Sequence, residues 1–250
     1  MKKYKMTTET KVWLGRTLHR IRAIVSFGNV NAGDLGGWIE KEENLSQKGS
    51  AWVFGSAMVY DSAMVCDSAM VCDSAIVCDS ARVCGSAMVC DSAWVCGSAR
   101  VCDSAWVCDS AWVFGSASVY DSARVYDSAM VYDSAIVCDS AWVFGSAMVY
   151  DSARVCDSAR VCGSAMVDKT THYLAIGAIG SRNDVTTFFR TKDKEIFVKC
   201  GCFHGSIDDF VKAVKEKNGD TKHEKTYLLA VELAKAQIED VENGGADDGK

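Results

Sequence analysis

From residue 49 onward, near-invariant apolar positions alternate with variable ones in a period of six. The series opens with GSAWVF, GSAMVY and DSAMVC and runs for twenty copies, ending with GSAMV at 163–167. In each copy Ala and Val lie two positions apart, so on a strand both point to one side and face a core. The residue between them varies and faces outward, while Asp-Ser or Gly-Ser favours a tight corner. This six-residue period predicts a parallel β-helix.

A small Ala and a branched Val leave a narrow core, which favours a triangular coil with three repeats, about 18 residues, in each turn. Successive turns would stack at about 4.8 Å, like neighbouring strands. We therefore expect an all-β, single-stranded parallel β-helix over 49–168. The absence of proline agrees with a chain that donates backbone hydrogen bonds along its length.

The sequence before the repeat predicts a cap, because an open end of a coil exposes backbone and core. Residues 1–48 predict an N-terminal β cap in which a strand at 12–14 and a strand at 17–27 form a hairpin turning at Gly15-Arg16. Ile39, Leu45 and Ala51 are spaced by six, so we expect a degenerate first coil before residue 49.

The sequence after the repeat predicts a small α+β domain over 169–243, followed by a disordered tail at 244–250. Strands are expected at 173–179, 185–190 and 195–203. Ser206 and Thr221 are each followed three residues later by an acidic residue, which predicts two helix starts. The apolar positions of the second helix are Tyr227, Val231, Ala234, Ile238 and Val241.

The spacing from Val53 to Ala57 and from Val59 to Ala63 resembles that of the hexapeptide-repeat, left-handed β-helix superfamily. The segment GDLGGWIE at 33–40 resembles the leader of bacterial and phage hexapeptide-repeat proteins labelled putative transferases. The resemblance implies a left-handed coil and, as an activity, acyl or nucleotidyl-type transfer. This chain departs from the family after the aliphatic residue, where it has Cys, Tyr or Phe instead of a small or acidic residue.

The net charge of −6 argues against nonspecific binding to nucleic acid, although the repeats hold 13 Asp against 5 Arg. Turn chemistry alone explains those aspartates, so they do not require mimicry of a nucleic-acid backbone. The chain has no apolar run of the ~20 residues that a membrane span needs, and no apolar segment follows its basic N-terminus. We expect a cytoplasmic protein, in the host cytoplasm if a phage encodes it, with no membrane partner.

Eleven of the thirteen cysteines occupy the sixth position of a repeat. Three repeats per turn would stack Cys72, Cys90 and Cys108 in one column, Cys78 and Cys96 in a second, and Cys66, Cys84 and Cys102 in a third. Stacked Cα atoms at about 4.8 Å fall within disulfide range. A reducing compartment and the apolar character of cysteine favour free thiols.

Candidate catalytic and metal-binding groups lie outside the repeats. A transferase needs a general base, and the histidines are His19, His172, His204 and His223. Cys200, Cys202 and His204 have the side chains of a zinc site, yet Cys-x-Cys-x-His is not a usual zinc spacing. We predict no catalytic residue, no cofactor and no metal.

The outward positions carry the strongest functional signal, because long apolar stripes on a soluble protein usually mark an interface. The predicted binding surface comprises Trp52, Trp94, Trp106, Trp112, Trp142, Arg82, Arg100, Arg124, Arg154 and Arg160. The first hypothesis is a non-enzymatic, homo-oligomeric binding or scaffold protein that engages or sequesters a host macromolecule or small ligand. The second is a hexapeptide-repeat transferase, and the third is a structural, polymer-forming rod.

Overall fold

The computed structural model describes residues 2–238, which divide into two compact units with the boundary between Thr170 and Thr171. The tail expected at 244–250 and the expected helix position Val241 lie outside the described residues. The first unit is a parallel β-solenoid behind an N-terminal cap, and the second is a small α+β unit.

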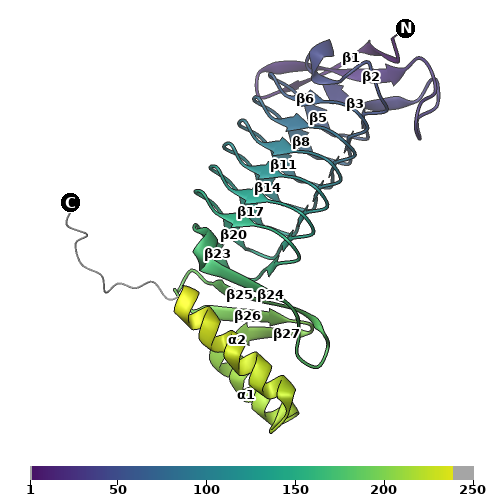
Figure 1. The fold of residues 1–250 in the computed structure, drawn as a ribbon. Helices are drawn as coiled ribbons and strands as arrows, with labels where there is room; N and C mark the ends of the chain where they lie inside the picture. The colour runs from purple at the N-terminus through teal and green to yellow at the C-terminus, as the bar shows by residue number, and fades with distance from the viewer. Residues whose placement is uncertain (1, 239–250) are drawn as a thin grey trace, which may run out of the picture. The chain divides into compact units, whose positions relative to one another are not determined.

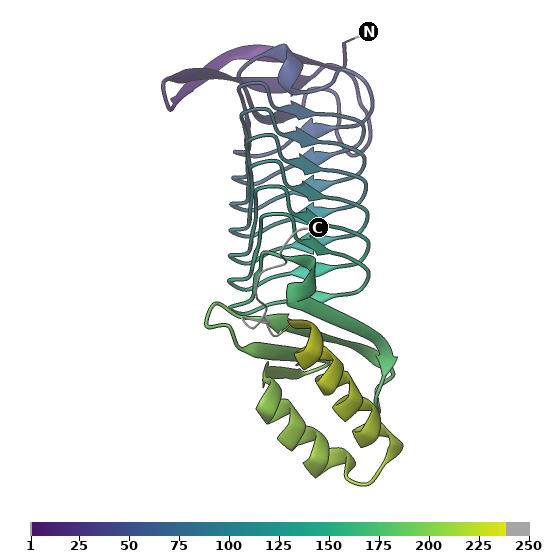
Figure 2. The ribbon, with the colours of Figure 1, turned by 60° about the vertical axis from the view of Figure 1, so that its left-hand side comes forward.

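The solenoid consists of two-residue strands separated by corners, and each strand pairs in parallel with the third strand after it in the chain. Figures 1 and 2 show the turns stacked one on another. One sheet contains β4 (Trp52–Val53), β7 (Met70–Val71), β10 (Met88–Val89), β13 (Trp106–Val107), β16 (Arg124–Val125), β19 (Trp142–Val143) and β22 (Arg160–Val161). The second contains β6 (Met64–Val65), β9 (Arg82–Val83), β12 (Arg100–Val101), β15 (Ser118–Val119), β18 (Ile136–Val137) and β21 (Arg154–Val155). The third contains β5 (Met58–Val59), β8 (Ile76–Val77), β11 (Trp94–Val95), β14 (Trp112–Val113), β17 (Met130–Val131), β20 (Met148–Val149) and β23 (Met166–Val167), and it continues into the cap. The predicted parallel β-helix with three repeats per turn is confirmed.

The core is built from the Ala and Val of every repeat, and no side chain of this set is more than 1% exposed. Burial of a Val side chain contributes about 1.5–3 kcal/mol, so the repeated Val supplies much of the cohesion. Between turns, the backbone N–H of Met70 donates to the carbonyl of Ala87 at 2.9 Å, and equivalent bonds recur along the axis. The core therefore stacks identical residues from turn to turn, as the alternation predicts.

The corners explain why each repeat begins with Asp or Gly. All twenty of these residues have φ between +52° and +72°, the left-handed region in which other L-residues cost about 1–2 kcal/mol. Asp adds a hydrogen bond between turns: Asp67 Oδ2 accepts from Gly85 N–H at 3.1 Å, and Asp79 Oδ2 from Gly97 N–H at 2.9 Å. The aspartates thus satisfy corner N–H groups, a structural role that agrees with turn chemistry.

The N-terminal cap begins with a hairpin of β1 (Tyr4–Trp13) and β2 (Arg16–Ala23), joined at Leu14 and Gly15, both with positive φ. The predicted hairpin is confirmed, but its turn lies one residue earlier than expected and its first strand begins at Tyr4 instead of Val12. The sequence of β1 is mostly polar and exposed, so it gave no apolar pattern that marks the full strand. Leu18 of β2 packs with the outward side chains of Met58 and Ile76.

The coil begins before residue 49, as predicted, but its first turn is longer than expected. In β3 (Leu35–Ile39), Ile39 pairs with Val59, and Leu45 forms a bridge with Val65 after the 3₁₀ turn Glu42–Asn44. The next core position belongs to Val53, which pairs with Val71, so the expected register of Ala51 with Ile39 and Leu45 was wrong. Two additional residues after Leu45 therefore loop out without disturbing the stack.

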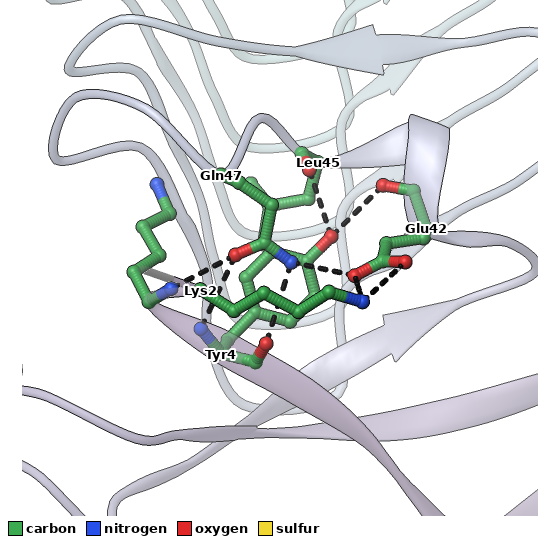
Figure 3. A network of polar contacts seen from close by, with 6 residues as sticks. Lys2, Tyr4, Glu42, Leu45 and Gln47 are labelled. Atoms are coloured by element: carbon green, nitrogen blue, oxygen red, sulfur yellow. Dashed lines mark hydrogen bonds and ion pairs between the residues drawn. The ribbon is translucent and has the colours of Figure 1, made fainter.

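A polar network holds the cap strand against this first turn (Figure 3). Tyr4 OH lies 2.7 Å from the Leu45 carbonyl oxygen, and Gln47 Oε1 accepts from Lys3 N–H at 2.9 Å. Glu42 accepts from Gln47 Nε2 at 2.8 Å and pairs with Lys2 Nζ at 2.6 Å. These contacts cover the backbone groups that the open end of the coil would otherwise expose.

Lys3 caps the first turn with a buried ammonium group. Its side chain is 4% exposed, and Nζ donates to the carbonyls of Ala51 at 2.8 Å and of Lys48 and Gly49 at 3.3 Å. Desolvation lowers the pKa of Lys3 to about 8.

We expect Lys3→Met to lower the free energy of unfolding by about 1–3 kcal/mol at pH 7, because it leaves buried carbonyls without a donor. Between the folded pKa of about 8 and the ordinary lysine pKa of about 10.4, the unfolded chain binds a proton that the folded chain has lost. The stability that Lys3 contributes should therefore increase from pH 8 to pH 10. Urea unfolding of both proteins across that range measures this, and a difference that shrinks with pH would contradict it.

The second unit contains a four-stranded antiparallel sheet of β24 (Tyr173–Ile179), β25 (Asp184–Arg190), β26 (Ile196–Cys200) and β27 (Phe203–Ser206) after the 3₁₀ turn Thr170–His172. The single strand predicted at 195–203 was wrong, because Gly201 adopts φ +57° and turns the chain between β26 and β27. Helices α1 (Ile207–Asn218) and α2 (Lys222–Ile238) begin where predicted, and Ser206 Oγ accepts from Asp209 N–H at 3.2 Å. The helices pack with Phe188 and Val198 of the sheet. Among residues 2–238, no helix has the length and apolar character of a membrane span.

Candidate binding faces of the solenoid

The strand register places the variable residues in three outward columns, one on each sheet. Each column contains the residues that were expected to share it from three repeats per turn. The Trp/Arg column is Trp52, Met70, Met88, Trp106, Arg124, Trp142 and Arg160. The Trp/Met column is Met58, Ile76, Trp94, Trp112, Met130, Met148 and Met166. The Arg column is Met64, Arg82, Arg100, Ser118, Ile136 and Arg154.

From Trp106 to Arg160, the Trp/Arg column alternates indole rings and guanidinium groups on consecutive turns. The Arg124 guanidinium carbon lies 5.1 Å from the ring centre of Trp106 and 5.0 Å from that of Trp142. Arg160 lies 5.5 Å from the other side of Trp142. Two rings therefore hold Arg124 by cation–π contact, which leaves the N–H donors at the guanidinium edge directed away from the rings.

A shallow hollow of about 260 Å³ opens at this place on the column. It is lined by Trp106, Cys108, Asp109, Arg124, Val125, Tyr126 and Trp142. Arg124 is exposed and forms no ion pair with any residue in 2–238. Burial, and then the Asp127 carboxylate, raise the pKa of Tyr126, so its phenol keeps its proton and can donate. The hollow thus combines apolar walls with three polar groups, the Arg124 guanidinium, the Tyr126 phenol and the Asp109 carboxylate, as ligand sites do.

The Trp/Met column is apolar throughout its seven positions. Trp94 and Trp112 stack with ring centres 5.1 Å apart, and Trp112 is 42% exposed. Leu18 of the cap covers Met58 and Ile76, whereas Met130, Met148 and Met166 remain half-buried. The uncovered part is an apolar stripe of the kind that marks protein interfaces.

The Arg column places Arg82 directly beside Arg100 on adjacent strands. Both are exposed, and neither forms an ion pair within the described part of the chain. Ser118 and Ile136 separate them from Arg154. This face is therefore basic mainly at the Arg82–Arg100 pair.

One member of the predicted binding surface is in the core of the cap. Trp52 is 1% exposed and makes edge contacts with the rings of Tyr4 at 6.0 Å and Phe27 at 5.4 Å. Gly36 approaches the same indole so closely that a Cβ atom there would lie 2.7 Å from it. The cap therefore covers Trp52, and its place on the binding surface was wrong.

The sixth positions also stack along the axis. Aromatic rings form ladders, with Phe114 and Tyr132 at 4.9 Å and Tyr126 and Phe144 at 5.0 Å between ring centres. Cys138 and Cys156 form a disulfide with Cα atoms 4.7 Å apart, and the other eleven cysteines are free. The expectation of free thiols was thus wrong for this one stacked pair.

Five of the free thiols in the solenoid have a raised pKa and are therefore poor nucleophiles: Cys66, Cys72, Cys78, Cys90 and Cys102. Burial, and then the Asp67 carboxylate, raise the pKa of Cys66 to about 11, and burial raises the pKa of Cys102 to about 12. Hydrogen bonds with neighbouring thiols lower the pKa of Cys96 and of Cys108. Every histidine lies outside the repeats, so no imidazole of the repeats can act as a base beside these thiols.

The candidate catalytic and metal-binding residues of the second unit do not come together in one site. Cys200 Sγ contacts Thr186 Oγ1 at 3.2 Å and packs toward the helices, whereas His204 stacks on Phe189 at the other face of the sheet. Cys200, Cys202 and His204 form no metal-ligating group in the described residues. His172 is 1% exposed and lies 3.2 Å from Arg190 Nη1.

Asp109 and Tyr126, which line the hollow beside Arg124, were not among the predicted site residues. The signal was present, because the fourth and sixth positions of a repeat lie two apart and point to the same side of a strand. Tyr126 is two positions beyond Arg124, so alternation alone could have included it.

One protein family matches part of the chain. The family described as YdcK β-solenoid repeat matches residues 123–139, about one turn of the coil, so this turn is similar to that repeat. No curated protein matches the chain.

Proposed function

We propose that the chain is a non-enzymatic binding protein whose Trp/Arg column binds an anionic group on a host macromolecule or small ligand in the cytoplasm. The observation that carries the proposal is Arg124, held between Trp106 and Trp142 and exposed without an ion pair in residues 2–238. A guanidinium group in this position favours bidentate contact with a carboxylate or phosphate, and the flanking indoles favour an apolar portion of the ligand.

Self-association through the Trp/Met column is the second part of the proposal. The exposed ring of Trp112 and the three methionines beyond it form an uncharged stripe, which favours burial against a second copy. The binding column and the stripe lie on different sheets, so an oligomer would leave the Trp/Arg column accessible. No specific observation favours a transferase, for which the buried His172 is a poor general base.

Native mass spectrometry of protein purified gently from a host lysate tests both parts. We expect one closed oligomer that carries a bound molecule with a carboxylate or phosphate group. A monomer would contradict self-association, and a ligand with no anionic group would contradict the assigned chemistry. A mass shift on addition of acyl-CoA would instead support a transferase.

We expect Arg124→Met to weaken binding of the recovered ligand by about tenfold to hundredfold, the usual cost of losing a charge-assisted hydrogen bond. Arg124→Lys should be nearly as damaging, because an ammonium group lacks the planar fork. Arg82→Met removes an exposed arginine from a different sheet and is the matched control. Calorimetric titration measures all three, and equal effects of Arg82→Met and Arg124→Met would exclude the Trp/Arg column.

A further inference from the structure

Three groups of side chains in the solenoid place two thiols beside a carboxylate. The groups are Cys66, Asp67 and Cys84; Cys78, Asp79 and Cys96; and Cys90, Asp91 and Cys108. Each contains the sixth residue of one repeat, the corner aspartate that follows it, and the cysteine one turn later. All six cysteines are free thiols.

The ligand atoms within each group lie within 4.8 Å of one another. Two thiolates bound to one tetrahedral zinc ion, at about 2.3 Å each, lie about 3.8 Å apart. Small side-chain rotations therefore bring both sulfurs and one carboxylate oxygen onto a single ion. Cys138 and Cys156, which are stacked in the same way, form a disulfide.

The carboxylates are already directed at the thiols. Cys66 Sγ lies 3.5 Å from Asp67 Oδ2, and Cys78 Sγ lies 3.9 Å from Asp79 Oδ2. A backbone N–H of the next turn holds each carboxylate, at 3.3 Å for Asp91, which is how outer contacts orient metal ligands. In each group at least one thiol is half-buried and the carboxylate is exposed, so an ion can enter from solvent.

We propose that these three groups are binding sites for a thiophilic divalent cation of the zinc class. Each site supplies two thiolates and one carboxylate, and a water molecule completes the four-coordinate shell. A divalent ion displaces the proton of each thiol, so binding to two protonated thiols releases two protons per ion. The pair Cys84 and Cys102 has Gly85 at the corner in place of Asp, so it lacks the third ligand.

The test uses the full chain, reduced, with Cys138→Ser and Cys156→Ser to remove the disulfide pair, whose reduced thiols would form a fourth group with Asp139. Cadmium is the probe, because thiolate-to-cadmium charge transfer is followed by ultraviolet absorption, and zinc is added as a competitor. The test variant combines Asp67→Gly, Asp79→Gly and Asp91→Gly. Glycine is the natural corner residue in seven of the twenty repeats, so these changes preserve the turn. The matched control combines Asp103→Gly, Asp121→Gly and Asp133→Gly, corners that belong to none of these groups.

We expect three cadmium ions per chain, displaced by zinc, with two protons released per ion. The test variant should bind them at least tenfold more weakly, and the control should bind like the parent. Circular dichroism verifies that both variants keep the fold. Absence of tight cadmium binding to the parent would overturn the proposal. Equal cadmium affinity of the test variant and the parent would contradict the assignment of the carboxylate as a ligand. The protein would then supply two thiolates and no carboxylate at each site.

Discussion

Val119→Asp is expected to lower the free energy of unfolding by at least about 4 kcal/mol, the range of a buried charge without a partner. Val119 is fully buried in β15, between β12 and β18. The core around it consists of Ala and Val side chains, which offer no hydrogen bond to a carboxylate. Urea unfolding followed by tryptophan fluorescence measures the loss, because all seven tryptophans lie in the first unit.

The adjacent residue provides the control for this prediction. Ser118→Asp introduces the same charge on the outward side of the same strand, beside Arg100. Surface changes of this kind usually alter stability by no more than about 0.5 kcal/mol. Similar losses for the two variants would mean that β15 does not alternate between core and surface as described.

The coil could be predicted from the sequence because every repeat has the same pattern of buried, outward and corner positions. Ala and Val two positions apart, bounded by a corner residue, specify the strand, its buried side and the turn of three repeats. The membership of the three outward columns follows from that turn by counting. The hydrogen bonds from the corner N–H groups to the Asp carboxylates of the preceding turn were not predicted, since they depend on the positive φ that the corner residues share.

The ends were less predictable, since they are formed by contacts that no repeat encodes. Trp52 looks like Trp106 in the sequence, and only the packing of Tyr4 and Phe27 buries it. The strand of Tyr4–Trp13 is mostly polar, so its pairing with β2 left no apolar pattern. The candidate binding site was predicted as a set of outward residues, but the cation–π contacts that select Arg124 depend on side-chain rotamers.

The stability of deletion variants of the solenoid should depend on whether whole repeats are removed, and not on the number of residues removed. Deleting 85–102 removes one full turn, stacks Met70 on Trp106 and preserves every column, so the protein should fold with the stability of a coil one turn shorter. Deleting 85–90 removes one repeat and should also fold, because Ala and Val still alternate, although each later side chain moves to another sheet. Deleting only 85–87 should lower the free energy of unfolding by at least about 4 kcal/mol, more than either longer deletion.

The physical reason is that a turn must close on itself before it can bond to the next. Without 85–87 one turn lacks the corner residues between two of its strands. Three residues of extended chain, about 10 Å, are then missing from the perimeter of that turn. The strands on either side then lose their pairing across the gap, and the Val side chains there lose their neighbours. The first turn of the coil tolerates two additional residues, because additional residues can form a loop outside the stack. Missing residues cannot be accommodated in this way, because the chain is then too short to close the turn. Urea unfolding of the three deletion variants orders their stabilities, and a three-residue deletion as stable as the six-residue one would contradict closure by corners.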